Sequence, residues 1–237
     1  MSWHLVRFSR GGAARYLSHL DTARALQRTF ARADVSIALS AGMRPRPRLS
    51  LVLPLPVGAV ALNELAVVEL VEPGQAGPQQ VVPQQADDAG ARDRLARLRA
   101  AAPEGLGIEA LEPAAARPHL VAVSADYECQ LAARPESLAQ ALAWFEGQEH
   151  VATERISPKG TKSVDLRRYV RGAFVKRSRR GSLLGFTVRY ESAGAARPEE
   201  FVRLLAVRAE ADPVMRDLVR TRVAYQESRG SSRAGKE

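Results

Sequence analysis

Residues 16–58 read YLSHLDTARALQRTFARADVSIALSAGMRPRPRLSLVLPLPVG, and this stretch determines how the first half of the chain folds. Ser18 is followed three residues later by Asp21 and then by an apolar-periodic run, which is the pattern of a capped helix start. The carboxylate also lies near the helix N-terminus, where the helix dipole favours negative charge. The expected buried face is the one on which apolar residues recur at helical spacing: Leu20, Ala23, Leu26, Phe30 and Ala33.

The same stretch is rich in arginine. On another face of the helix, a cationic stripe is expected from residues spaced four apart: Arg24, Arg28 and Arg32. Residues 42–48 (GMRPRPR) cannot be helical, because Pro45 and Pro47 fix their own φ and push the preceding residues toward extended geometry. We therefore expect an extended rod that presents three guanidinium groups, those of Arg44, Arg46 and Arg48. An apolar strand over 49–55 follows, and the turn at Gly58 closes it.

This order of motifs resembles the radical-SAM-linked family of unknown function, whose pattern is SHLD, a helix, GFNPHP and an apolar strand that ends in PLP and Gly. Here Met43 stands for Phe, while Arg44 and Arg46 stand for Asn and His, so no role that needs that His is carried over. Members of the family lie beside, or are fused to the C-terminus of, a cobalamin-dependent radical S-adenosylmethionine (SAM) protein. The resemblance implies such a protein as partner and implies no particular reaction.

The composition of the chain points to a polyanionic partner. The chain has 237 residues, a formal net charge of +9 and a sequence pI near 10.4. Such a balance is typical of proteins that bind nucleic acid, although a basic surface can also serve solubility alone. Hydrophobic residues make up 46%, which is enough for a core, and only 5% are aromatic, so Leu, Val and Ala should dominate that core.

Several classes of site are not expected. The single cysteine, Cys129, excludes a disulfide within the chain and a cysteine-ligated zinc or iron–sulfur site, so any radical chemistry would use a cluster held elsewhere. The remaining histidines, His4, His119 and His150, lack metal-ligand spacing, and we expect no metal and no cofactor bound by this chain. No apolar run is long enough for a transmembrane helix, and no signal-peptide pattern is present, so a cytoplasmic location is expected.

The order of elements predicts an α+β fold of two tandem ferredoxin-like (βαββαβ) units with antiparallel sheets. The first unit combines strands at 4–9, 49–55, 64–71 and 108–111 with two helices. One helix begins at Ser18 and ends near Asp34, and the other covers 91–102. The second unit combines strands at 124–132, 183–190 and 219–225 with helices at 136–148 and after residue 197. Extended segments are expected at 151–156 and 165–176. The predicted domains are 1–112 and 119–225, joined by a linker at 113–118 and followed by a disordered tail at 226–237.

The densest positive charge lies between residues 155 and 189, a segment that contains eleven Lys and Arg residues and a single acidic residue, Asp165. The predicted nucleic-acid-binding residues of this half are Arg167, Arg168, Arg171, Lys176, Arg177, Arg179 and Arg180. Tyr169 and Phe174 lie among them, and basic sheet faces with aromatic residues suit single-stranded RNA. A solvated basic hairpin, or one that binds an acidic protein, is the alternative. Asp165 belongs to a Val-Asp-Leu-Arg motif like the family's, and it either caps a turn or orients Arg167.

His19 is the one catalytic candidate, since it lies at a helix start near Tyr16 and Asp21. An imidazole can act as general acid and base on RNA, as a histidine does in CRISPR-repeat endoribonucleases, which also have two ferredoxin-like units.

Three functions are compatible with these patterns. The first is a non-catalytic accessory protein that presents tRNA or ribosomal RNA to a separate cobalamin-dependent radical SAM enzyme. The second is a metal-independent endoribonuclease that uses His19. The third is a protein-interaction subunit of the enzyme that binds no RNA.

Overall fold

The computed structural model describes residues 1–71, 88–157, 160–211 and 218–228. The described chain has a mixed α+β fold with five α-helices and mostly antiparallel sheet pairing. It divides into two compact units. Unit 1 holds Met1–Val57, Asn63–Val121 and the described residues from Gln226 onward, and unit 2 holds Gly58–Leu62 and Ala122–Tyr225. No described helix combines the length and the apolar composition that a membrane crossing requires.

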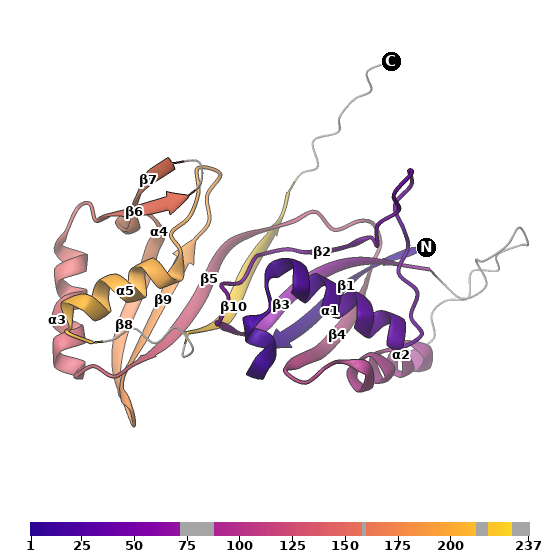
Figure 1. Ribbon diagram of the computed structural model, residues 1–237, viewed down its shortest axis with the longest axis horizontal. Coiled ribbons are helices and arrows are strands. Elements are labelled where there is room, and N and C mark those ends of the chain that lie inside the picture. The colour runs from indigo at the N-terminus through magenta and orange to yellow at the C-terminus, as the bar shows by residue number, and fades with distance from the viewer. Residues whose placement is uncertain (72–87, 158–159, 212–217, 229–237) are drawn as a thin grey trace, which may run out of the picture. The chain divides into compact units, whose positions relative to one another are not determined.

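Unit 1 places its strands in the order β4-β1-β3, with β2 paired to β3 (Figure 1). The β1–β4 and β2–β3 pairs are antiparallel. Its elements are β1 (Ser2–Arg10), the 3-10 helix η1 (Gly12–Tyr16), α1 (His19–Arg32), β2 (Leu49–Leu51), β3 (Val60–Leu70), α2 (Asp88–Ala101) and β4 (Leu106–Ala114), except that residues 60–62 of β3 belong to unit 2.

The core of unit 1 lies between α1, α2 and the sheet, where Phe8, Leu26, Phe30, Leu98 and Ile108 belong to one buried cluster. Leu26, Phe30 and Ala33 were expected in it from the helical spacing, but Leu20 is 56% exposed. The buried face instead includes two threonines, Thr22 and Thr29. Their hydroxyls donate to the carbonyls of Ser18 (2.9 Å) and Ala25 (3.0 Å), so these polar groups enter the core already hydrogen bonded.

Two strand boundaries of unit 1 differ from the prediction. The strand expected over 49–55 ends at Leu51, because Pro54 and Pro56 have no N–H to donate to a ladder. In contrast, β4 continues to Ala114, so the first two residues of the predicted linker at 113–118 belong to a strand.

Unit 2 places its strands in the order β10-β5-β9-β8. At the other side of β10, Val219 and Arg220 pair in parallel with Val60 and Ala61, the first residues of β3. Its elements are β5 (Leu120–Leu131), α3 (Pro135–Gly147), β6 (Ala152–Ser157), β7 (Gly160–Asp165), α4 (Leu166–Tyr169), β8 (Val170–Ser178), β9 (Gly181–Arg189), α5 (Pro198–Arg208) and β10 (Leu218–Glu227).

Helices α3 and α5 pack together on one face of the unit 2 sheet, and α5 lies in front of β9 in Figure 1. The rings of Phe145 (α3), Phe201 (α5) and Phe186 (β9) are in contact, with centroids 4.9 Å apart at each step. Tyr127 of β5 stacks on Phe186 at 5.6 Å. Cys129 is fully buried in β5.

The segment predicted to be extended at 151–156 forms β6, and it pairs with β7, which was not predicted, in a separate two-stranded sheet. At the other end of the chain, β10 extends to Glu227, two residues beyond the predicted strand. Of the tail predicted at 226–237, residues 229–237 lie outside the described residues.

Candidate nucleic-acid interface

The cationic stripe of α1 lies on its solvent side. Ser18 is the N-cap of this helix, where its Oγ accepts a hydrogen bond from the Asp21 N–H at 3.1 Å. The hydrogen bond from the Ser18 hydroxyl lowers the pKa of Asp21, and Arg24 adds to this effect from 3.2 Å. All three arginines of the stripe, Arg24, Arg28 and Arg32, are exposed. Arg28 and Arg32 form no ion pair within the described chain, so their charges face solvent.

The proline–arginine segment, which was predicted to be an extended rod, is attached to the rest of unit 1 at its C-terminal end. Its end folds back on residues 38–40: Leu39 and Pro47 form a β-bridge, and the Ser40 N–H donates to the Arg46 carbonyl at 2.8 Å. Arg48 Nη1 lies 2.5 Å from a carboxylate oxygen of Glu69, which is buried. The backbone N–H of Glu69 also bonds to the Arg48 carbonyl. Arg48 therefore joins the segment to β3.

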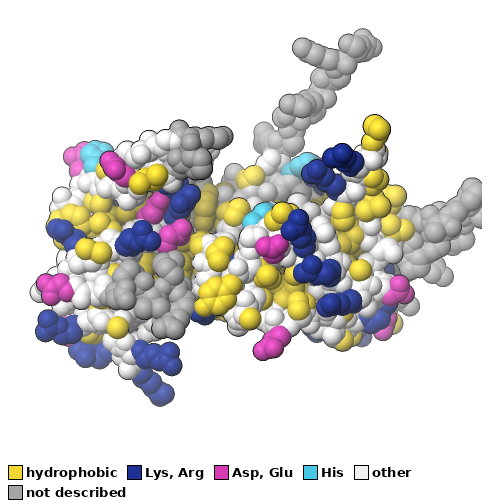
Figure 2. Space-filling model, in the orientation of Figure 1, with side chains coloured by type: hydrophobic (Ala, Val, Ile, Leu, Met, Phe, Trp, Pro, Cys, Tyr) yellow, Lys and Arg dark blue, Asp and Glu magenta, His cyan; other side chains and the backbone are white. Residues whose placement is uncertain are grey.

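Arg44 and Arg46 remain exposed, and neither pairs with a carboxylate among the residues described. Dark blue side chains follow α1 and the loop after it on one face of unit 1 (Figure 2). We call the four cations of α1 and of the loop after it that have no carboxylate partner in the described chain the unit 1 basic row. They are Arg28, Arg32, Arg44 and Arg46.

In unit 2, acids from distant parts of the sequence neutralise several of the predicted cations. Arg168 pairs with Glu191 at 2.7 Å, and Arg177 pairs with Glu136 at 2.8 Å. Arg155, from the same basic segment, pairs with Glu200 at 2.7 Å. The excess of charge counted along the sequence is thus partly cancelled in space.

Two further arginines of this segment act as donors to the backbone. Arg167 Nε donates to the Gln148 carbonyl at 3.0 Å, and its guanidinium lies 5.0 Å from the centre of the Phe145 ring. Because Gln148 is the C-cap of α3, this cation sits where the helix dipole favours positive charge. Arg171 donates to the carbonyls of Arg167 and Val170. Both guanidinium groups are held by protein contacts.

Among the predicted nucleic-acid-binding residues of this half, three have side chains with neither a carboxylate nor a backbone carbonyl as partner in the described part of unit 2: Lys176, Arg179 and Arg180, at or near the turn of the β8–β9 hairpin. We call them the hairpin cations. Of the two aromatic residues expected among the cations, Tyr169 is buried, with 7% of its surface exposed. Phe174 is 38% exposed, and Lys176 Nζ lies 4.7 Å from the centre of its ring.

Asp165 caps a turn and does not pair with the guanidinium of Arg167. Its Oδ1 accepts the N–H groups of Arg167 and Val151, each at 3.0 Å, and it is the N-cap of α4. Its Oδ2 lies 2.8 Å from Nδ1 of His150. Burial alone would raise the pKa of Asp165, but the hydrogen bonds from His150 and the two N–H groups leave it lowered. The same contact raises the pKa of His150.

The start of α1 and the loop at 53–58 are joined through Arg10, a residue just beyond the strand predicted at 4–9. Arg10, only 2% exposed, donates to the Leu17 carbonyl (2.8 Å), to Thr22 Oγ1 (2.8 Å) and to the Pro56 carbonyl (3.2 Å). Its position was readable from β1, since residues 4, 6, 8 and 10 alternate onto the buried face. Gly58 has φ of 89°, a conformation that favours glycine.

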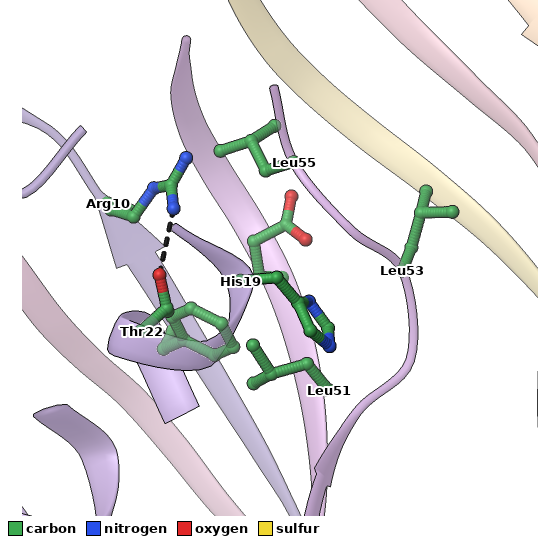
Figure 3. A pocket seen from close by; sticks show the side chains of 8 residues that line it. Arg10, His19, Thr22, Leu51, Leu53 and Leu55 are labelled. Carbon is green, nitrogen blue, oxygen red and sulfur yellow. Dashed lines mark hydrogen bonds between the residues drawn. The ribbon is translucent and has the colours of Figure 1, made fainter. Parts of the chain in front are cut away.

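His19 lies at the mouth of a small cavity beside this arginine (Figure 3). The cavity holds about 10 Å³, near the lower limit for one water molecule. The His19 side chain is exposed, while Asp21 is engaged by Ser18 and Arg24. The residues that line the cavity are Phe8, Arg10, His19, Thr22, Leu51, Leu53, Leu55 and Glu64. No group of three or more residues that could hold a metal ion occurs among the described side chains.

The model of one protein family, described as "Uncharacterized protein conserved in bacteria (DUF2344)", matches residues 4–198. The chain belongs to this family. The DUF2344 match covers both motif segments and most of unit 2, and its description assigns no activity. No curated protein matches the chain. A crystal structure described as a "putative glycine cleavage system transcriptional repressor" aligns with 96% of this chain and 99% of its own chain at 9% identity, with a TM-score of 0.24, too low to carry an argument.

Proposed function

We propose that this protein is a non-catalytic RNA-binding accessory that presents tRNA or ribosomal RNA to a separate cobalamin-dependent radical SAM enzyme. The observation that carries the RNA part is the unit 1 basic row, four exposed guanidinium groups of α1 and the loop after it that have no carboxylate partners in the described chain. The enzyme partner rests on the family resemblance of the motifs at 18–21 and 42–58. The chain itself would supply no cofactor.

The chemistry of the basic row suits a phosphate backbone. Guanidinium groups bind phosphate oxygens through paired N–H donors, and each such bond releases condensed counterions from the nucleic acid. Exposed cations without partners can bind phosphate without breaking an existing ion pair. The hairpin cations of unit 2 meet the same condition and form a second candidate binding surface.

We further propose that both units are ferredoxin-like. In unit 1 the sheet order β4-β1-β3-β2 places the fourth, first, third and second strands side by side. Unit 2 repeats this order as β10-β5-β9-β8 if the β6–β7 hairpin is counted as an insertion. Two helices cross between strands in each case, as a βαββαβ unit requires.

The direct test is binding of labelled tRNA and of a short labelled single-stranded RNA over a range of salt concentrations. Wild type should bind, with log Kd rising steeply as log salt rises. Replacing Arg28, Arg32, Arg44 and Arg46 with Gln should weaken binding. The salt slope for the single strand should flatten by about 0.7 for each phosphate that the variant no longer neutralises.

A matched control removes the same formal charge from paired cations. Arg7, Arg24, Arg168 and Arg177 each form an exposed ion pair, and replacing these four with Gln lowers the net charge by the same amount. Binding that falls equally in both variants would show that net charge alone matters and that the basic row is not a site. Cleavage of the RNA that disappears in His19→Ala would instead indicate an endoribonuclease.

The partner is tested separately, by capture of tagged protein from its native cells with and without nuclease. Recovery of a radical SAM protein together with a defined RNA supports the proposal. Recovery of the same protein after nuclease treatment, with no RNA enriched in the untreated sample, would indicate a protein-interaction subunit.

A further inference from the structure

One face of the unit 2 sheet carries no helix among the residues that the structure describes. The aromatic core places α3 and α5 against the face of Tyr127 and Phe186. Residues that pair directly across antiparallel strands point to the same face. The opposite face therefore holds the alternate residues of β5 and β9 and their partners on β8: Asp126, Glu128, Gln130, Leu183, Gly185, Thr187, Phe174 and Lys176. We call it the open face.

A glycine lets the Phe174 ring reach across this face. Gly185 pairs with Phe174 on one side and with Glu128 on the other. The far edge of the Phe174 ring lies directly over Gly185, so closely that a Cβ at that position would overlap the ring. The ring therefore reaches from the edge strand β8 toward Glu128 on β5. Neighbouring strands are about 4.8 Å apart, so a flat ligand on the ring would have one edge beside that carboxylate.

Some of the polar side chains around the Phe174 ring are already hydrogen bonded to other side chains of the protein, and one of them is not. Thr187 donates to Asp126 at 2.7 Å, and Ser178 donates to Gln130 at 2.6 Å. Within the described chain, Glu128 makes no hydrogen bond or ion pair with another side chain. A carboxylate is an acceptor only, so it favours a ligand edge that carries N–H donors.

Cations lie at both ends of the open face. Lys176 and the turn of the β8–β9 hairpin, with Arg179 and Arg180, are at one end. Arg189, exposed at the end of β9, shares the face because it follows Thr187 by two residues. At about 3.3 Å per residue, the distance along β9 from Leu183 to Arg189 is roughly 20 Å. Open sheets of this kind stack two or three bases in RNA-binding modules.

We propose that the open face holds single-stranded RNA, with a base that carries an exocyclic amino group stacked on Phe174 and donating from that group to Glu128. The stacked base takes the place of the Lys176 ammonium over the ring, and the hairpin cations, Lys176 among them, bind the adjoining phosphates. This site rests on the proposed RNA-binding function and adds to it a preference for cytosine, adenine or guanine over uracil.

The test compares short cytidine and uridine oligonucleotides of equal length, which carry the same charge and differ at the base edge. Wild type should bind the cytidine oligomer more tightly. Phe174→Leu keeps an apolar cover over Gly185 and removes the aromatic face, so binding should fall by about five- to a hundredfold while the salt slope is unchanged. Phe174→Tyr should retain binding.

Glu128→Gln should reduce the preference for cytidine over uridine, because an amide offers a donor as well as an acceptor. Lys176→Gln removes a cation that binds phosphate, so it should lower the salt slope by about 0.7 and leave the base preference intact. Unfolding midpoints of all variants identify any that lose structure, and Phe174→Tyr then reports on stacking alone.

The outcomes separate the two proposals. RNA binding by wild type with no loss in Phe174→Leu, or with equal affinity for the two oligomers, overturns the base site and leaves the RNA-binding function standing. Absence of RNA binding by wild type at low salt overturns both.

Discussion

Arg10 is a buried arginine that hydrogen bonds to three separate segments of unit 1. Its guanidinium joins the end of η1, the first turn of α1 and the loop at Pro56. Each hydrogen bond from a charged donor contributes roughly 1.5 kcal/mol or more, so Arg10→Ala should lower the free energy of unfolding by about 3 kcal/mol or more. Arg10→Lys keeps the charge but cannot reach all three acceptors and should cost less. Urea unfolding measures both, with the exposed Arg28→Ala as a control expected within about 0.5 kcal/mol of wild type.

The His150–Asp165 contact makes stability depend on pH near neutrality. The hydrogen bond between the two side chains raises the pKa of His150 above the usual value of about 6.5. The folded state therefore binds the proton more tightly, and this contribution is full below the unfolded pKa and disappears as pH rises through the folded one. Between about pH 6 and 8, the thermal midpoint of wild type should fall more steeply with pH than that of His150→Gln. Parallel curves for the two proteins would contradict the contact.

At the scale of elements, an ion pair attaches the β6–β7 hairpin to α5. Arg155 bonds to both carboxylate oxygens of Glu200, and the side chains are only 20% and 12% exposed. Arg155→Ala leaves that carboxylate without its partner, and amide hydrogen exchange should accelerate in β6 and β7 while β5 and β9 stay protected. Lys162→Ala, on the same hairpin and exposed, is the matched control. Equal exchange in both variants would show that the pair does not hold the hairpin.

The elements that could be predicted are those marked by residues close together in the sequence, such as a helix cap or an alternating strand. Ser18, Asp21 and the helical spacing mark α1, and alternation marks β1. The spacing placed Leu20 wrongly in the core, because the elements that pack against a helix determine which of its faces is buried. Thr22 and Thr29 are buried because their hydroxyls are hydrogen bonded to the helix backbone, which a hydropathy pattern does not indicate. Strand β7 was missed because its residues, GTKSVD, are mostly polar or charged and carry no alternating apolar pattern.

For the molecule as a whole, the sequence located the basic segments but not which of their cations are available. The ion pairs of Arg155, Arg168 and Arg177 join residues 45, 23 and 41 positions apart. Such pairs depend on the tertiary fold, and no local pattern reveals them. The open face was equally hidden, since it requires Phe174, Gly185 and Glu128 to share one row across three strands.

Because each unit has its own set of cations without carboxylate partners, we can test whether the two units bind one RNA. Replacing the unit 1 basic row with Gln, or replacing the hairpin cations with Gln, removes phosphate-binding cations from one unit at a time. If both units bind the same molecule, the decreases in binding free energy and in salt slope should add in the combined variant, because the two sets do not touch the same partners. Salt titrations with tRNA measure both quantities. If the combined variant is no weaker than the unit 1 variant, RNA binding belongs to unit 1 alone, and the open face of unit 2 must serve another ligand.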